Sequence, residues 1–251
     1  TEVKLPSTLK EIYAYAFRNC TSLEEIELPD SITGMSACAF ENCSKLSRVN
    51  FPLNWKTTYD SSSNRNDYYV DSNSYYYFSP FVGCGSLKNM VVPEGVTAIP
   101  KHAFRGMTAL TEIDLPETLT SIGAYAFYNA DGLTGLELPE AFTTIGGHAF
   151  YDADGLKEIN LADSVVSIGA YAFAESAGLV NITTGSTLTN LGTCAFENCG
   201  GLKSVDLSAS TGITRINGYV FSGCSGLTEV KLPSTLKEIY AYAFLNCTSL
   251  E

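Results

Sequence analysis

The sequence has little positive charge and almost no histidine. Its 251 residues include 15 Lys and Arg against 27 Asp and Glu, for a formal net charge of −12, and only two histidines. Nucleic-acid binding needs clustered basic side chains that neutralise phosphates, so this composition excludes it as the expected function. Anionic membrane surfaces are disfavoured for the same electrostatic reason.

Long apolar runs and known catalytic motifs are also missing. No uninterrupted apolar stretch reaches the 18 or more residues of a membrane-spanning helix. The sequence contains no HExxH motif, no P-loop and no GxGxxG after an expected strand. The nearest approach to a GxSxG nucleophile elbow, GCSG at 223–226, does not fit that motif. We therefore expect a chain that is not an enzyme, has no membrane-spanning segment and uses no cofactor.

What the sequence does contain is a repeat marked by a phenylalanine, usually in an Ala-Phe pair. Successive phenylalanines of this kind mostly differ in number by 23, with one interval of 41 and one of 25. The ten copies are Phe17, Phe40, Phe81, Phe104, Phe127, Phe150, Phe173, Phe196, Phe221 and Phe244. Ten 23-residue units therefore fill the chain, one of them with an 18-residue insertion and another with two extra residues.

Apolar residues keep fixed distances from this phenylalanine. A leucine follows it by six positions in every copy, and apolar residues precede it by eight and by five positions in most copies. Pairs such as Ile26 and Leu28 follow by nine and eleven, which predicts a short strand with one buried face. A unit this short cannot enclose its own core, so neighbouring units must cover each other. We predict one solenoid over residues 1–251, with little helix.

The repeat pattern L-P-x-x-L-x-x-I-x-x-x-A-F-x-x-C-x-x-L-x-x-I-x-L resembles the BspA-like class of leucine-rich repeat over nearly the whole chain. The resemblance implies a curved leucine-rich-repeat stack with a parallel β-sheet on its concave face. It also implies an extracellular protein of a bacterial or protist cell surface that acts in adhesion. Because Thr1 begins in the middle of a repeat, we expect the chain to be part of a longer array.

Six of the eight cysteines occupy one position of the repeat, three residues after the phenylalanine. Other copies carry Met107, Ala130, Ala153 or Ser176 there, which is typical of a small core position and favours a ladder of reduced cysteines over disulfides. Cys38 and Cys194 lie two residues before the phenylalanine, where other copies have tyrosine or one of the two histidines, His102 and His148. We interpret this as an aromatic packing position and expect no metal site. The six cysteines at the core position are Cys20, Cys43, Cys84, Cys199, Cys224 and Cys247.

The first candidate binding surface is the outer side of the predicted concave sheet. Its outward positions form an acidic stripe, which would attract a basic partner by long-range electrostatics. A solvated face without a partner is the alternative interpretation. The candidate residues are Glu25, Glu27, Arg48, Asn50, Glu112, Asp114, Glu137, Glu158, Asp206 and Glu229.

The second candidate is the segment that breaks the repeat, which we place at residues 53–79. It combines the only tryptophan with many tyrosines among Ser, Asn and Asp, a composition that recognition loops use because rigid aromatic rings give contact area at low entropic cost. A loop packed on its own solenoid is the alternative. The candidate residues are Trp55, Tyr59, Tyr68, Tyr69, Tyr75, Tyr76 and Tyr77.

Together these observations favour a non-catalytic binding scaffold that mediates adhesion or protein–protein interaction with a host or microbial surface protein. A carbohydrate-binding module of a larger surface enzyme, which would contact a glycan through the aromatic insertion, is the first alternative. A structural spacer is the second. The surface location rests on the family resemblance alone.

Overall fold

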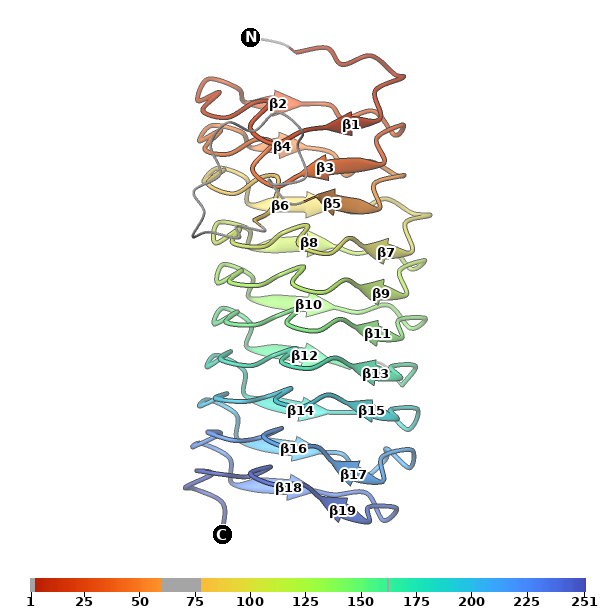
Figure 1. The fold of residues 1–251 in the computed structure, drawn as a ribbon, viewed down its shortest axis with the longest axis vertical. Coiled ribbons are helices and arrows are strands. Elements are labelled where there is room, and N and C mark those ends of the chain that lie inside the picture. The colour runs from red at the N-terminus through yellow and green to blue at the C-terminus, as the bar shows by residue number, and fades with distance from the viewer. Residues whose placement is uncertain (1–2, 60–77, 162) are drawn as a thin grey trace.

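The computed structural model describes residues 3–59, 78–161 and 163–251. The chain winds as a parallel β-solenoid in which most paired strands lie one repeat apart in the sequence. Its turns stack along the long axis, and the two ends of the chain lie at opposite ends of the stack (Figure 1). Its regular elements within these ranges are short strands, and no helix occurs among them. The predicted repeat solenoid is confirmed.

The expected I-x-L strands form the first series. Each pairs in parallel with the equivalent residues one turn away, as Leu136 does with Ile159. In most of these strands the central residue is buried and its neighbours point outward, as the alternation predicts. The series comprises β2 (Glu25–Ile26), β4 (Arg48–Val49), β6 (Asn89–Val91), β8 (Glu112–Asp114), β10 (Gly135–Glu137), β12 (Glu158–Asn160), β14 (Asn181–Thr183), β16 (Ser204–Asp206) and β18 (Glu229–Lys231).

A second series of parallel strands, not predicted from the sequence, contains the residue five positions before the phenylalanine. Glycine follows several of these strands because the backbone of the neighbouring turn leaves no room for a side chain. A Cβ on Gly146, for example, would lie 2.6 Å from the backbone nitrogen of Ala124. The series comprises β1 (Glu11–Ile12), β3 (Gly34–Ser36), β5 (Thr57–Tyr59), β7 (Ala98–Ile99), β9 (Ser121–Ile122), β11 (Thr144–Ile145), β13 (Ser167–Ile168), β15 (Asn190–Leu191), β17 (Arg215–Ile216) and β19 (Glu238–Ile239).

The repeated phenylalanines stack inside the solenoid. Phe127 and Phe150 are parallel, with ring centroids 5.2 Å apart, and both are fully buried. The same spacing separates Phe150 from Phe173 and Phe173 from Phe196. Because each ring contacts the rings above and below it, the column joins consecutive turns by dispersion and by the burial of apolar surface.

Two left-handed residues shape the turn around each repeated phenylalanine except Phe81, where Gly83 alone has positive φ. In one turn they are Tyr125, with φ of 59°, and Asn129, with φ of 53°. The N–H groups of Tyr125, Phe127 and Asn129 donate to carbonyl oxygens of the next turn at 3.1, 2.7 and 2.9 Å. The position of Asn129 holds Asn, Gly, Asp or Glu in other copies, and Asn and Gly are the residues that tolerate positive φ best. Backbone geometry therefore accounts for the repeated asparagine.

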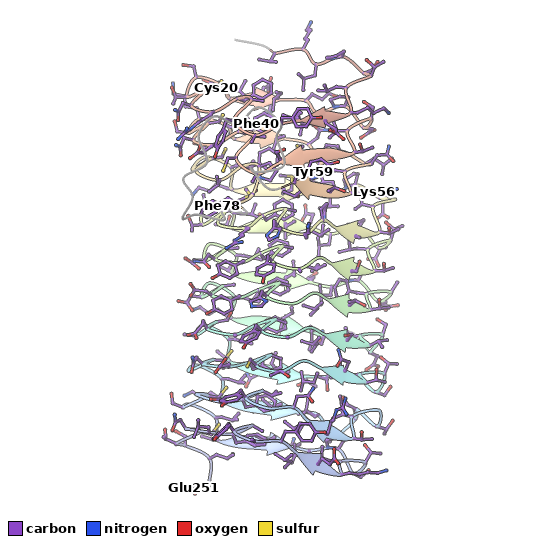
Figure 2. The ribbon with its side chains drawn as sticks, in the orientation of Figure 1. Cys20, Phe40, Lys56, Tyr59, Phe78 and Glu251 are labelled. Carbon is purple, nitrogen blue, oxygen red and sulfur yellow. The ribbon has the colours of Figure 1, made fainter. Side chains whose placement is uncertain are left out.

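The structure corrects the bounds of the insertion. Trp55 lies eight positions before the next phenylalanine once residues 60–77 are left out of the count, so it occupies the ordinary apolar slot of its repeat. Residues 57–59 form β5, which pairs in register with β3. Figure 2 shows Lys56, Tyr59 and Phe78 at nearly the same level of the stack. The extra segment is thus 60–77 rather than 53–79.

Trp55 is consequently a core residue. Only 1% of its surface is exposed, and its ring meets Phe81 and Phe104 edge-on, with centroids 6.4 Å away in both cases. Its indole nitrogen donates to the Thr57 carbonyl oxygen at 2.9 Å. A buried tryptophan whose polar group is satisfied stabilises the fold and offers nothing to a partner.

The stacked column predicts a large effect of truncating one ring. We expect Phe127→Ala to lower the free energy of unfolding by about 3 to 5 kcal/mol, because it opens a cavity and removes contacts with two neighbouring rings. Urea denaturation followed by circular dichroism measures this. Thr108→Ala, at an exposed turn position of the adjacent repeat, is the control and should change stability by less than about 0.5 kcal/mol. Equal effects of the two substitutions would contradict the packing account.

The corrected register makes a second prediction. Deleting residues 60–77 joins Tyr59 to Phe78 and restores the ordinary repeat interval between Phe40 and Phe81. We therefore expect the deletion variant to fold with a melting temperature close to that of the intact chain. A deletion of equal length from a regular repeat, residues 124–141, removes part of the core and should abolish cooperative unfolding. Failure of the first variant to fold would show that the register is wrong.

Candidate functional site

The first strand series carries the predicted acidic residues on one surface, which we call the acidic face. It consists of the outward side chains on, or directly after, β2, β4, β6, β8, β10, β12, β14, β16 and β18. All ten candidate residues occur there, and the parallel register places equivalent positions of successive turns side by side. Its place on the concave side of the stack stays a prediction.

The few basic residues of the acidic face lie near its two ends. Arg48 on β4 forms an ion pair with Glu25 on β2. At the other end Lys231 on β18 lies 3.2 Å from a carboxylate oxygen of Asp206 and 3.7 Å from one of Glu229. These pairs are exposed and contribute little to stability, but they neutralise the acids beside them.

Two candidate residues serve the fold directly. The side chain of Asn50 accepts a hydrogen bond from the Leu28 nitrogen at 2.6 Å and donates to the Leu28 oxygen at 2.7 Å, which closes the end of β2. Asp206 accepts hydrogen bonds from the hydroxyl and the backbone nitrogen of Ser208, and these bonds, with a smaller contribution from Lys231, lower the pKa of its carboxyl group. Both side chains already have partners.

The acids in the middle of the acidic face form no ion pair with a described residue. We call these residues, Glu112, Asp114, Glu137 and Glu158, the central acidic patch. All four are exposed, and none has a basic partner within 4.0 Å among the residues that the structure describes. β8 is in contact with β10, and β10 pairs with β12, so the four carboxylates occupy three adjacent strands. Like charges on neighbouring strands repel. The patch is therefore a concentrated negative potential that the described part of the fold leaves uncompensated.

The aromatic candidates of the insertion separate into three cases. Trp55 is buried, which corrects its interpretation as an exposed recognition residue. Tyr59 is half-buried at the end of β5, and its hydroxyl donates to a carboxylate oxygen of Glu11 at 3.2 Å; burial, with a further contribution from Glu11, raises its pKa. The remaining candidates, Tyr68, Tyr69, Tyr75, Tyr76 and Tyr77, lie outside the described residues.

A second surface, which we call the aromatic columns, was not identified from the sequence as a site. His102, Tyr125, His148 and Tyr171 stack along successive turns with centroids 5.0, 4.6 and 4.8 Å apart. This confirms that both histidines occupy aromatic packing positions. A shorter column of Tyr128 and Tyr151, 4.8 Å apart, lies beside it. The signal that could have found the shorter column is the position one after the repeated phenylalanine, where tyrosine occurs in two consecutive copies; the longer column occupies the position two before it.

Four of the six cysteines three positions after the phenylalanine are buried in the core, as predicted, whereas Cys247 is half-buried and Cys20 is exposed in the terminal turns. Cys199 and Cys224 are fully buried, and their thiols donate to the carbonyl oxygens of Phe173 and Phe196 in the preceding turn, both at 3.0 Å. Ser176 makes the equivalent bond to Phe150 at 2.6 Å. Each thiol thus links two turns. All eight cysteines are free.

Two kinds of feature are absent from the described part of the chain. No cluster of three or more His, Cys, Asp or Glu side chains there has the arrangement of a metal site. None of its segments forms a helix that is long and apolar enough to cross a membrane.

This geometry is that of a repeat solenoid whose candidate sites are surfaces rather than pockets. The sequence pattern described as the BspA type leucine rich repeat region matches in six copies over residues 1–70, 74–203 and 143–251. The chain belongs to this family of leucine-rich repeat proteins.

Solved structures agree with this assignment. A leucine-rich repeat protein from Bacteroides ovatus is 27% identical with a TM-score of 0.60, and the match covers 96% of this chain and 69% of that one. The Treponema pallidum leucine rich repeat protein is similar in fold at 22% identity and a TM-score of 0.51, over 91% of this chain and 78% of that one. No curated protein matches this sequence.

The buried thiols predict a dependence of stability on alkaline pH. Burial raises the pKa of Cys84 and of Cys224 from an ordinary value of 9.0 to about 12. The unfolded state therefore loses these protons at a lower pH than the native state, and stability falls as pH rises from about 9 toward 12.

Urea denaturation at several pH values between about 8 and 11 tests this dependence. The double variant Cys84→Ala with Cys224→Ala should lose stability at all pH values because of the smaller side chains, but its slope above pH 9 should be shallower. Thr108→Ala, which leaves every thiol in place, is the control and should keep the slope of the intact chain. Parallel curves for all three proteins would contradict the prediction.

Proposed function

We propose that this chain is a non-catalytic binding scaffold of a cell-surface or secreted protein. Its acidic face binds an extended, basic segment of a host or microbial surface protein, and this contact contributes to adhesion. The central acidic patch is the observation that carries the proposal. Family membership supports a role in protein interaction, because leucine-rich repeats present long continuous surfaces to their partners.

The shape and charge of the patch favour a particular kind of partner. Its carboxylates are spread over three strands spaced about 4.8 Å apart, so they match Lys or Arg side chains that recur along an extended peptide better than one compact cation. The side chains between them are small or polar, such as Gly135 and Asn160, and give a partner room to approach. Steering by the negative potential would raise the association rate and make it sensitive to salt.

The insertion of residues 60–77 is the second element of the proposal. Its tyrosines among Ser, Asn and Asp have the composition of a recognition loop. The carbohydrate-binding alternative loses the support of Trp55, which is buried. A spacer without binding activity remains the alternative, and it predicts that neither surface has a partner.

Neutralising the central acidic patch tests the role of the acidic face. The variant combines Glu112→Gln, Asp114→Asn, Glu137→Gln and Glu158→Gln. The probe is a short fluorescent peptide that alternates Lys and Ser, measured by anisotropy at low and at physiological salt. We expect about tenfold weaker binding by the variant, since four weak ion pairs together contribute about 1 to 2 kcal/mol.

The control has the same change in net charge at exposed acids of another repeat position, away from this face: Glu94→Gln, Glu117→Gln, Glu140→Gln and Asp163→Asn. It should bind the peptide nearly as well as the intact chain. Equal weakening in both variants would mean that only net charge matters, and it would overturn the proposed face. The deletion variant lacking 60–77 should keep peptide binding, and loss of adhesion to cells in that variant alone would assign adhesion to the insertion.

A further inference from the structure

The guanidinium of Arg105 lies among three aromatic rings. Arg105 follows Phe104 directly, and its guanidinium carbon lies 4.4 Å from the Tyr128 ring centroid and 5.5 Å from that of Tyr125. Phe78 is a third aromatic neighbour, with its centroid 5.8 Å away. Cation–π contacts of this kind fix the plane of the guanidinium and restrict its rotamers.

A second arginine occupies the same repeat position in another copy, and its charge is paired with a carboxylate. Arg18 also follows the repeated phenylalanine, and its Nε lies 2.8 Å from a carboxylate oxygen of Glu41 in the next turn. The residue equivalent to Glu41 in the turn after Arg105 is Tyr128. Arg105 therefore has an aromatic ring where Arg18 has a carboxylate.

Within the described ranges, the charge of Arg105 is not compensated. No carboxylate in these ranges pairs with it, and its Nε is buried there without a hydrogen-bond partner. Burial lowers the pKa of the guanidinium from its ordinary value, but arginine keeps its charge in proteins. A fixed, partly desolvated cation that lacks a counter-ion among the described residues favours the binding of an anion.

The tyrosine and histidine rings beside Arg105 also favour the binding of an anion. Tyr128 stacks face to face on Tyr151, and Tyr125 stacks face to face on His148. Rings that stack along the solenoid present their edges sideways, and the edge of an aromatic ring carries the positive part of its quadrupole. The half-buried tyrosines also bring hydroxyl groups that can donate and accept hydrogen bonds.

The charge of the rest of the surface limits the size of the anion. The net charge is −12, and Asp131 and Asp152 lie one and two turns beyond Arg105, where burial and neighbouring acids raise the pKa of both carboxyl groups. A long polyanion would be repelled by these acids. A single carboxylate fits, provided that the rest of the ligand is uncharged and rich in hydroxyl groups that match the tyrosines.

We propose that Arg105, together with Tyr125, Tyr128, His148 and Tyr151, binds a carboxylated sugar, such as a terminal sialic or uronic acid. The guanidinium pairs with the carboxylate, and the tyrosine hydroxyls bond to sugar hydroxyls. This site is separate from the acidic face and does not depend on the function proposed for it. It would let the same solenoid contact an acidic glycan at one surface and a basic protein segment at another.

Isothermal titration with sialyllactose tests the site, with lactose as the matched neutral sugar. The intact chain should bind sialyllactose at least about tenfold more tightly than lactose, and Arg105→Met should lose at least about tenfold in affinity, as expected for a hydrogen-bonded ion pair. Tyr128→Phe keeps the ring and removes one hydroxyl, so it should weaken binding severalfold. Glucuronic acid should compete with sialyllactose.

Arg18→Met is the matched control, because it removes an arginine from the same repeat position. It should keep sialyllactose binding, and both arginine variants should retain the circular dichroism spectrum of the intact chain. No binding of sialyllactose by the intact chain, equal binding of lactose, or equal loss in both arginine variants would overturn the proposal. Inorganic phosphate that displaces sialyllactose at the same concentration as glucuronic acid would overturn the sugar part.

Discussion

Each turn of the solenoid must satisfy its backbone hydrogen bonds and cover its apolar face with the next turn, because a unit this short can do neither alone. The Phe127 N–H reaches the Ala149 oxygen one turn away, its ring lies on Phe150, and the equivalent contacts recur through the stack. The constant repeat length, the left-handed residues beside each phenylalanine and the buried thiols all follow from this requirement.

The same requirement determines what a functional site can be. Each position of the repeat forms a column along the solenoid, in which the equivalent residues of successive turns lie about 5 Å apart. An extended surface of one chemical character therefore forms where several consecutive copies carry similar charged or aromatic residues at the same position. The central acidic patch and the columns around Tyr125 and Tyr128 are two such places. One departure in a single copy, Arg105, supplies the second surface with its cation.

Much of this could be predicted from the sequence, because each signal recurs in copy after copy. Ten phenylalanines in register predict the solenoid, the I-x-L strands and the core position of the cysteines. The second strand series was missed because only one apolar residue marks it. Trp55 was misassigned because its copy is interrupted by residues 60–77 and has Thr58 where other copies have an apolar residue, which hides the register.

Periodicity is a local property of the chain, so the architecture and the inward positions of the repeat follow from the order of residues alone. Which charged side chains form ion pairs does not follow from the order of residues alone. Glu25 and Glu112 occupy the same repeat position, yet Arg48 compensates the first, and no residue in the described ranges compensates the second. Arg18 and Arg105 differ in the same way. Whether a charge has a partner depends on the side chain one turn away, at least a full repeat along the chain, and that contact exists only once the turns have stacked.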